Sequence, residues 1–401
     1  MSVMKWMEGG VTAAQGFLAS GVSAGIKRSR KPDLALVVSE TPAIAAAVFT
    51  LKRVQAAPVR LSARRVRRGA ARAVLLNSGC ANCLTGSAGL RDALQLGRSA
   101  ARAADLNESD VLLASTGLIG RRLPVARMER AVPKLVEGLS RAHHRAAAEA
   151  ILTTDLKPKE AAVEARIDGR ICRVGGMAKG AGMIAPSMAT MLCVITTDAA
   201  VSAGLLRELL RDVTEETFNR ITVDGDMSTN DTVFALANGR SGVMIREGAA
   251  LRMFARMLFE VSAKLATQIV KDGEGASRLM EVQVVGARTD AEARLCARMV
   301  ANSPLVKTML AGGDPNVGRI AAAVGASTAR FDAEKLELFV GKQRVVARGE
   351  IVRIGSGTLR ALLTQPRVVV RIDLHAGRAE SLMLTCDLTQ EYVRINAGYA
   401  T

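Results

Sequence analysis

The sequence predicts an α+β fold. Stretches in which apolar residues recur at helical spacing alternate with short, β-branched apolar runs, and these runs are more frequent in the C-terminal half. The chain has 401 residues, of which 49% are hydrophobic, so it can bury a sizeable core. No internal repeat and no linker rich in proline or serine divides the chain. We therefore expect a compact, interwoven molecule.

Two periodicities place the elements. Helical spacing of apolar residues predicts helices over residues 91–104, 125–150, 202–216 and 251–270. Short apolar runs predict strands in the first part of the chain over residues 45–49, 73–76, 111–114, 164–174 and 192–196. The later part of the chain has predicted strands over residues 278–285, 336–340, 368–374 and 382–388.

The stretch from Gly175 to Asp198 carries the main chemical signal. A glycine-rich loop with Pro186 runs directly into an apolar strand through the dipeptide Ala189-Thr190. Strain focused on one peptide bond favours an acyl shift, in which the Thr190 hydroxyl attacks the Ala189 carbonyl and water releases the ester. Thr190 would become a new N-terminus, whose amine titrates at about 8 and can act as base for its own hydroxyl. From spacing alone, an ordinary glycine-rich turn before a strand remains the alternative.

Histidine is scarce, which also favours this nucleophile. Of the three histidines, His143 and His144 lie in an Ala/Arg-rich helical segment and His375 lies near the end of an apolar strand. The sequence therefore offers no well-placed histidine for a Ser-His-Asp triad. A threonine activated by its own amine is the more economical nucleophile.

The sequence predicts no metal site. Six scattered cysteines favour reduced thiols that fill small buried spaces. Cys80 and Cys83 form a CxxC pair, but no second pair follows and no histidine stands at ligand spacing. The acidic run 224–231 fails the calcium-loop template, because Thr229 replaces the glycine and Ala235 replaces the bidentate glutamate. We interpret this run as a loop that caps a following helix.

The net charge of +17 is compatible with a nucleic-acid partner, and arginines cluster over residues 60–72. One Trp, two Tyr and eight Phe give few platforms for base stacking, and no nucleic-acid motif is present. We therefore expect a solvated basic face and no nucleic-acid partner. No apolar run can span a bilayer, and Glu8 interrupts the position of a signal peptide's apolar segment. We expect a cytoplasmic protein with no membrane partner.

Many short motifs resemble one family. Residues 178–199, AKGAGMIAPSMATMLCVITTDA, closely resemble the self-cleavage segment of the ornithine acetyltransferases, the bifunctional glutamate N-acetyltransferases of arginine biosynthesis. Other segments resemble the same family in the same order: DLALVVSE, AAAVFT, NSGCANCLTG, STGLIGRRLP, TTDLKPKEA, FNRITVDGDMSTNDTVFALANG, KDGEGA, NSPLVKTMLAGGDPNVGRIAAAVG and CDLTQEYVRINAGYAT. The resemblance covers the chain from about Gly10 to Thr401.

The resemblance implies an architecture and a maturation step. In the family fold, sheets pack between helices. Cleavage between Ala189 and Thr190 would give an α chain of residues 1–189 and a β chain of residues 190–401 that stay intertwined as one globular unit. A heterotetramer of two α and two β chains is the implied assembly.

The resemblance also assigns site residues. Thr190 matches the threonine that first cleaves the chain and then carries the acetyl group, while the Thr116 hydroxyl and the Gly117 amide look like the oxyanion hole. The matching substrate-binding positions are Thr153, Lys179, Thr190, Glu274, Asn396 and Thr401. Lys179 with hydroxyl groups can receive an α-carboxylate, and Glu274 can receive an amino group. Thr154 remains an alternative to Thr153.

The implied activity is transfer of an acetyl group from N2-acetylornithine to glutamate through an acetyl-threonine intermediate. It needs no metal or bound cofactor, and acetyl-CoA as a second donor stays open. Four positions depart from the family pattern: Ser187, Met227, Val317 and Ala400. Ser187 bears on the rate of self-cleavage. An autoproteolytic aminopeptidase of related fold and a basic nucleic-acid-binding protein that has lost catalysis are the alternatives.

Overall fold

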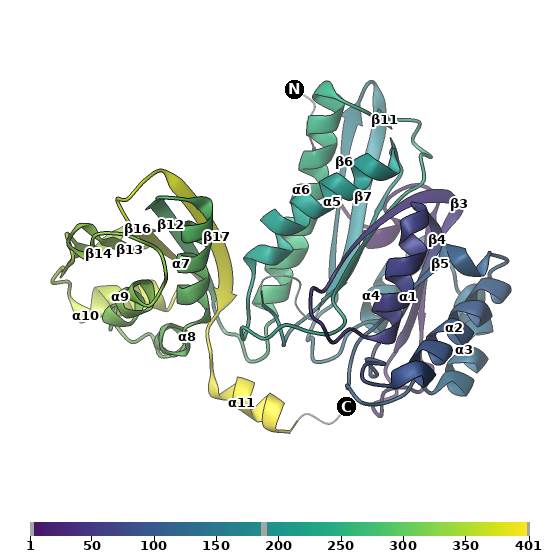
Figure 1. Ribbon diagram of the computed structural model, residues 1–401, viewed down its shortest axis with the longest axis horizontal. Coiled ribbons are helices and arrows are strands. Elements are labelled where there is room, and N and C mark those ends of the chain that lie inside the picture. Colours follow the sequence, from purple (N-terminus) through teal and green to yellow (C-terminus); the bar gives the residue numbers. More distant parts are fainter. Residues whose placement is uncertain (1–3, 186–190, 399–401) are drawn as a thin grey trace. The chain divides into compact units, whose positions relative to one another are not determined.

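The computed structural model describes residues 4–185 and 191–398, and the chain forms two compact units (Figure 1). The first unit contains residues 4–219 and 226–269, and the second contains residues 220–225 and 270–398. Each unit combines a sheet with helices, which confirms the predicted α+β class.

A mixed sheet forms the centre of the first unit. Within the described residues it has nine strands in the order β1-β6-β7-β8-β10-β3-β4-β5, with β2 paired to β3 beside this path. The pairs β8–β10 and β4–β5 are parallel. The strands are β1 (Lys5–Met7), β2 (Phe17–Val22), β3 (Leu34–Phe49), β4 (Ala70–Asn77), β5 (Val111–Ser115), β6 (Lys159–Ile167), β7 (Arg170–Lys179), β8 (Leu192–Thr197) and β10 (Thr232–Ala237). The short strands β9 (Ala200–Val201) and β11 (Met244–Ile245) pair separately.

The large sheet folds over into two layers that share strand β3. The first half of β3 pairs with β2 and the second half with β10, while its register with β4 shifts between Val38 and Ala43. One core lies between the layers, and it contains Leu112 of β5, Val194 of β8 and Phe234 of β10. Strands β5, β8 and β10 are buried along their whole lengths, so they read as nearly continuous apolar runs in the sequence.

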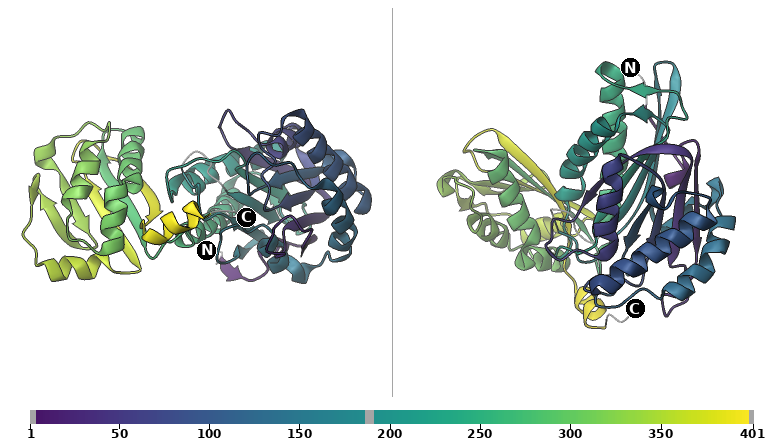
Figure 2. Two further views of the ribbon diagram at one scale, coloured as in Figure 1. Left: turned by 90° about the horizontal axis from the view of Figure 1, so that it is seen from below. Right: turned by 45° about the vertical axis from the view of Figure 1, so that its right-hand side comes forward.

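Helices cover the outer faces of both layers, as the family resemblance implies. Figure 2 shows α2 (Gly86–Ala103) and α3 (Val125–Glu137) side by side, and together with α1 (Ala57–Arg65) they pack on β3, β4 and β5. On the other layer, Val261 and Leu265 of α6 (Gly248–Lys271) face Gly176 of β7, and α5 (Ala203–Glu216) packs beside β3. The short helix α4 (His144–Ala150) contributes Ala147 to the core between the layers.

Strand register brings several chain segments to one end of a layer. Thr232, the first residue of β10, pairs with Phe49 at the end of β3 and with Leu192 at the start of β8. Leu192 in turn pairs with Lys179, the last residue of β7. The residues just before β8, just before β10 and at the end of β7 therefore lie in one row.

The second unit contains a smaller sheet. In the part of the chain that the structure describes, it has six strands in the order β15-β14-β13-β16-β12-β17. They are β12 (Leu279–Ala287), β13 (Glu337–Val340), β14 (Gln343–Ala347), β15 (Glu350–Ile351), β16 (Arg367–Asp373) and β17 (Ala379–Cys386). The helices are α7 (Asp290–Asn302), α8 (Pro304–Gly312), α9 (Gly318–Gly325), α10 (Ser356–Leu363) and α11 (Gln390–Ala397). Helix α7 packs on β12 and β17 over a core that includes Val282 and Val284 (Figure 1).

The predicted helix over residues 125–150 is wrong as a single element. Helix α3 ends at Glu137, and α4 begins only at His144. Between them, the Ser140 hydroxyl accepts a hydrogen bond from the Ala142 amide and caps a short 3₁₀ turn. The local cap interrupts an apolar pattern that is helical on both sides.

The predictions of a strand over residues 164–174 and of a helix after the acidic run are also wrong. The predicted strand over residues 164–174 is a hairpin of β6 and β7, whose turn residues Asp168 and Gly169 both have positive φ, as Asp-Gly hairpin turns require. The acidic run 224–231 precedes strand β10 and not a helix. All six residues of β10 are buried in the centre of the sheet, so tertiary packing decides this element.

A glycine in β7 gives a test of the close packing. A Cβ atom on Gly175 would lie 2.0 Å from the carbonyl oxygen of Gly10. Gly175→Ala is expected to destabilise the protein by roughly 1–3 kcal/mol because the backbone must shift. Gly204→Ala, on exposed α5 with open space around it, is the control and should raise stability by up to about 1 kcal/mol. Urea denaturation measures both, and equal midpoints for the two variants would contradict this packing.

Candidate active site

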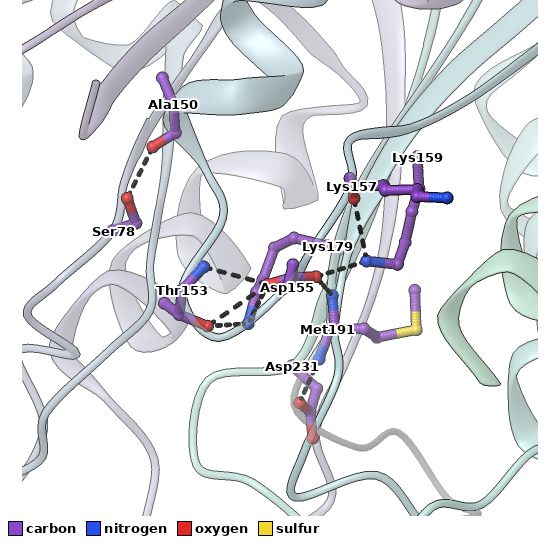
Figure 3. Close-up of polar contacts among 10 residues, drawn as sticks. Ser78, Ala150, Thr153, Asp155, Lys157, Lys159, Lys179, Met191 and Asp231 are labelled. Atoms are coloured by element: carbon purple, nitrogen blue, oxygen red, sulfur yellow. Dashed lines mark hydrogen bonds and ion pairs between the residues drawn. The ribbon is translucent and has the colours of Figure 1, made fainter. Parts of the chain in front are cut away.

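An enclosed carboxylate organises the predicted substrate-binding residues of the first unit. Asp155 follows α4, and its side chain is fully buried. Its Oδ1 accepts hydrogen bonds from the Lys159 ammonium at 2.7 Å and from the Gly180 amide at 2.6 Å. Its Oδ2 accepts from the Thr153 amide at 3.0 Å and lies 3.6 Å from the Lys179 Nζ. Figure 3 shows Asp155 between these groups.

The structure brings two of the predicted residues into direct contact. The Lys179 ammonium donates a hydrogen bond of 2.8 Å to the Thr153 hydroxyl (Figure 3). Lys179 closes strand β7, and its side chain is only 2% exposed. A cation beside a hydroxyl is a suitable pair of donors for a carboxylate ligand.

Electrostatics keep this cluster charged. Burial by itself would raise the pKa of the Asp155 carboxyl, but the ammonium groups of Lys179 and Lys159 outweigh it and hold that pKa well below its usual range. Asp155 was not identified from the sequence. The signal that could have found it is that Lys159 and Lys179 both lie in apolar strand patterns, where a buried ammonium needs an anion.

The predicted oxyanion hole is a turn at the end of β5. Thr116 is 2% exposed, and its amide donates to the Asn77 carbonyl at 2.9 Å. Gly117 has a φ of +124°, and a Cβ atom there would lie 2.4 Å from the carbonyl carbon of Gly79. This position therefore requires glycine, because a side chain would collide with the backbone of Gly79. Thr116 and Gly117 lie as a turn that can present a hydroxyl and an amide together.

The predicted nucleophile Thr190 and the predicted cleavage site between Ala189 and Thr190 lie outside the described residues. Their described neighbour Met191 donates its amide hydrogen to Oδ1 of Asp231 at 3.0 Å (Figure 3). Burial raises the pKa of Asp231 to about 8, while the Met191 amide and Lys179 act in the opposite direction. Its Oδ2 is buried and has no hydrogen-bond partner among the residues that the structure describes. The sequence interpretation treated Asp231 only as part of a capping loop.

Two predicted residues meet in the second unit. The Asn396 amide of α11 donates to Oε2 of Glu274 at 2.7 Å, and Glu274 is 8% exposed. The loop that carries Glu274 approaches α11 closely, because a Cβ atom on Gly275 would lie 2.6 Å from the Tyr392 amide nitrogen. Thr401 lies outside the described residues. Glu274 and Asn396 are therefore neighbours, whereas Thr116, Gly117, Thr153 and Lys179 belong to the first unit.

Other predictions from composition have mixed outcomes. All six cysteines are buried, as expected of small core residues. The expectation of a solvated basic face is wrong for Arg65, which is 8% exposed and donates to the Val111 carbonyl at 2.6 Å. Helix packing against β5 encloses this guanidinium beside Glu108. No helix in the described part of the chain has the length and apolar character needed to cross a membrane.

The turn with Thr116 and Gly117 and the buried Lys179 beside the Thr153 hydroxyl make the first unit a candidate acyl-transfer site. The whole chain is similar to one family. The model of the ArgJ family matches residues 18–401, and the chain belongs to that family. The resemblance to ornithine acetyltransferases seen in the sequence motifs is confirmed.

Curated relatives match over their full lengths. The arginine biosynthesis bifunctional protein ArgJ of Thermosynechococcus vestitus is 45% identical over 419 residues, which cover 100% of both chains. The protein of the same name from Symbiobacterium thermophilum is 46% identical and covers 99% of this chain and 100% of its own. The solved ornithine acetyltransferase of Mycobacterium tuberculosis, complexed with ornithine, is 42% identical over 46% of this chain and 99% of that chain, with a TM-score of 0.43.

The Asp155 cluster predicts a pH-dependent contribution to stability. Its folded pKa lies below the unfolded value of about 3.9, so the stabilisation is complete above about pH 4 and is lost as the pH falls further. Asp155→Asn should cost roughly 3–5 kcal/mol at pH 7 because it leaves buried ammonium groups unpaired, and the difference from wild type should shrink below about pH 4. Urea titrations followed by circular dichroism at several pH values measure this difference.

Glu149→Gln is the matched control for Asp155→Asn. Glu149 also pairs with a cation four residues away along the chain, but this pair with Arg145 is exposed. Its loss should cost less than about 1 kcal/mol. An Asp155→Asn variant that is no less stable than Glu149→Gln at pH 7 would refute the role of the enclosed carboxylate.

Proposed function

We propose that this chain transfers an acetyl group from N2-acetylornithine to glutamate through an acetyl ester on Thr190. Membership of the ArgJ family over nearly the whole chain supports this activity. The observation that carries the proposal is the hydrogen bond from the buried Lys179 ammonium to the Thr153 hydroxyl. Donor and acceptor substrates both have an α-carboxylate, and this pair of groups suits that charge.

The proposed reaction has two balanced steps. The Thr190 amine accepts the hydroxyl proton as the hydroxyl oxygen attacks the acetyl carbonyl, and the Thr116 hydroxyl and Gly117 amide stabilise the oxyanion. The amide bond breaks and ornithine leaves with that proton on its amine. The amine of glutamate then attacks the acetyl-threonine ester, the ester C–O bond breaks, and the Thr190 oxygen takes the proton that the glutamate amine loses. The resemblance of the sequence motifs implies substrate-binding roles for Glu274 and Asn396, and Glu274 suits an amino group.

Maturation by cleavage between Ala189 and Thr190 is part of the proposal. Strands β8 and β10, which follow the proposed cleavage site, lie between β7 and β3, which precede it. Such interleaving supports fragments 1–189 and 190–401 that stay associated through sheet hydrogen bonds and a shared core. We further propose a cytoplasmic heterotetramer of two α and two β chains that acts without a metal, a bound cofactor, nucleic acid or a membrane.

An assay with each acetyl donor separately tests which compound supplies the acetyl group. Purified protein is given glutamate with N2-acetylornithine or with acetyl-CoA, and N-acetylglutamate is measured for each donor. Formation with N2-acetylornithine supports the proposed transfer, and formation with acetyl-CoA would add a second donor. Hydrolysis of peptides without acetyl transfer would favour the aminopeptidase alternative and overturn the proposal.

The cleavage step predicts defined masses. The expressed chain should mature into fragments 1–189 and 190–401, and Thr190→Ala should give an intact, inactive chain because no hydroxyl is left to attack. Thr190→Ser retains a hydroxyl and is the conservative control, expected to mature and turn over more slowly. Intact-mass measurement and the transfer assay follow all three proteins. Substantial transfer by Thr190→Ala would mean that the nucleophile is another residue.

The oxyanion hole predicts a kinetic signature. Removing one such donor typically lowers the rate by about 10² to 10³, so Thr116→Ala should lower kcat sharply with little change in KM. The comparison applies to protein that has matured, since cleavage can use the same donors. Steady-state kinetics per mature chain measure the effect, and a mature Thr116→Ala protein with normal kcat would contradict the assignment.

A further inference from the structure

Two adjacent buried residues have no role in the proposed reaction so far. Asn230 and Asp231 precede strand β10, and they are 3% and 0% exposed. Burying an amide and a carboxyl side by side is unfavourable unless their polar atoms have partners. The partners of the Asn230 amide and of the Asp231 Oδ1 lie in separate parts of the candidate active site.

Asp231 and the start of β10 hold the residue that follows the nucleophile. The Asp231 Oδ1 accepts the Met191 amide hydrogen at 3.0 Å. The Met191 carbonyl in turn accepts from the Thr232 amide at 3.1 Å. Both backbone polar groups of Met191 are therefore fixed, and Met191 is joined to Thr190 by one peptide bond.

Asn230 holds the oxyanion-hole turn. Its Nδ2 donates to the Ser115 carbonyl and to the Ala81 carbonyl, each at 2.7 Å. Ser115 is the residue before Thr116, so this contact lies one peptide bond from the proposed oxyanion donor. The Thr229 hydroxyl donates to the Asn230 Oδ1 at 2.6 Å, which fixes the orientation of the amide.

Thr50, the residue after strand β3, also contacts the segment that contains the Asn-Asp pair. The Thr50 amide donates to the Asp231 carbonyl at 3.0 Å, and the Thr50 hydroxyl donates to the Ser228 carbonyl at 2.8 Å. Ser228 also accepts from the Asn230 amide through its hydroxyl at 3.1 Å. A buried network with this many partners allows the segment little freedom.

We propose that Asn230 and Asp231 are positioning residues. They fix the oxyanion-hole turn relative to the backbone segment that begins at Met191, the residue after the proposed nucleophile Thr190. The inference rests on the proposed acetyl transfer through Thr190. The two residues are neighbours, so their Cα atoms are held about 3.8 Å apart by the peptide bond. One therefore sets the place of Met191 in one layer of the sheet, and the other sets the place of Ser115 in the other layer. Neither residue takes part in a bond-making or bond-breaking step of the proposed reaction.

The first test compares two asparagines that flank the same strand. Asn230→Ala should lower kcat per mature chain by about tenfold to a hundredfold, because a misplacement of about 1 Å can cost that much, and should change KM by less than about threefold. Asn238 follows the other end of β10, and its Nδ2 donates to the Gln15 carbonyl at 2.8 Å. Asn238→Ala removes a similar contact away from the site and should leave kcat within about twofold of wild type.

A second pair of variants separates position from bulk stability. Asp231→Asn keeps an oxygen that can accept the Met191 amide hydrogen, so it should retain a kcat within about threefold of wild type, whereas Asp231→Ala should fall by about tenfold or more. This pair decides the question if Asn230→Ala does not fold or mature. Equal kcat values for Asp231→Asn and Asp231→Ala would overturn the positioning role.

The wild-type protein distinguishes failure of this inference from failure of the proposed function. A mature wild type that does not acetylate glutamate from N2-acetylornithine would refute the proposed function. An active wild type whose Asn230→Ala variant matches Asn238→Ala in kcat would refute the positioning role alone. Thermal melting of both asparagine variants checks that a loss of kcat is not a loss of folded protein.

Discussion

The carboxylate of Asp155 is enclosed between two buried ammonium groups, and the candidate substrate contacts of the first unit depend on it. An ammonium such as that of Lys179 would lose its hydration in this position and would tend to become neutral. The carboxylate offsets that cost for Lys159 and Lys179, and it also accepts amide hydrogens from Thr153 and Gly180. Lys179 is thereby held in one orientation beside the Thr153 hydroxyl.

The two-layer sheet explains why residues far apart in the sequence share one site. Strands β7, β8 and β10 bring their neighbouring ends into one row, and β5 from the other layer contributes the turn with Thr116 and Gly117. The core between the layers is built from alternate residues of both halves of the sheet, so neither layer can shift without opening it. Asn230 crosses between the layers where the polar residues gather.

Buried polar groups have different structural roles in the two units. In the first unit they connect strand ends and enclose charges, as Asp155 and Asp231 do. In the second unit the Glu274 carboxylate is held by Asn396 on α11, whose docking is fixed by the close approach at Gly275. Among the residues assigned from family motifs, Thr116, Lys179 and Glu274 are buried, which suits side chains that must keep one orientation.

The sequence by itself determined the α+β class, the family and most of the helices and strands, because periodicity and contiguous motifs are local properties. Its motifs also named Thr116, Gly117, Thr153, Lys179 and Glu274 as candidate site residues. The single helix predicted over residues 125–150 is interrupted by a local cap, and the single strand predicted over residues 164–174 contains a tight turn. The helix predicted after the acidic run is strand β10, because sheet packing overrides local preference there. Only the tertiary structure identified Asp155, Asn230 and Asp231 as organising residues. Their partners lie many residues away along the chain, and pairing between distant residues is set by strand register and burial, which no local pattern encodes.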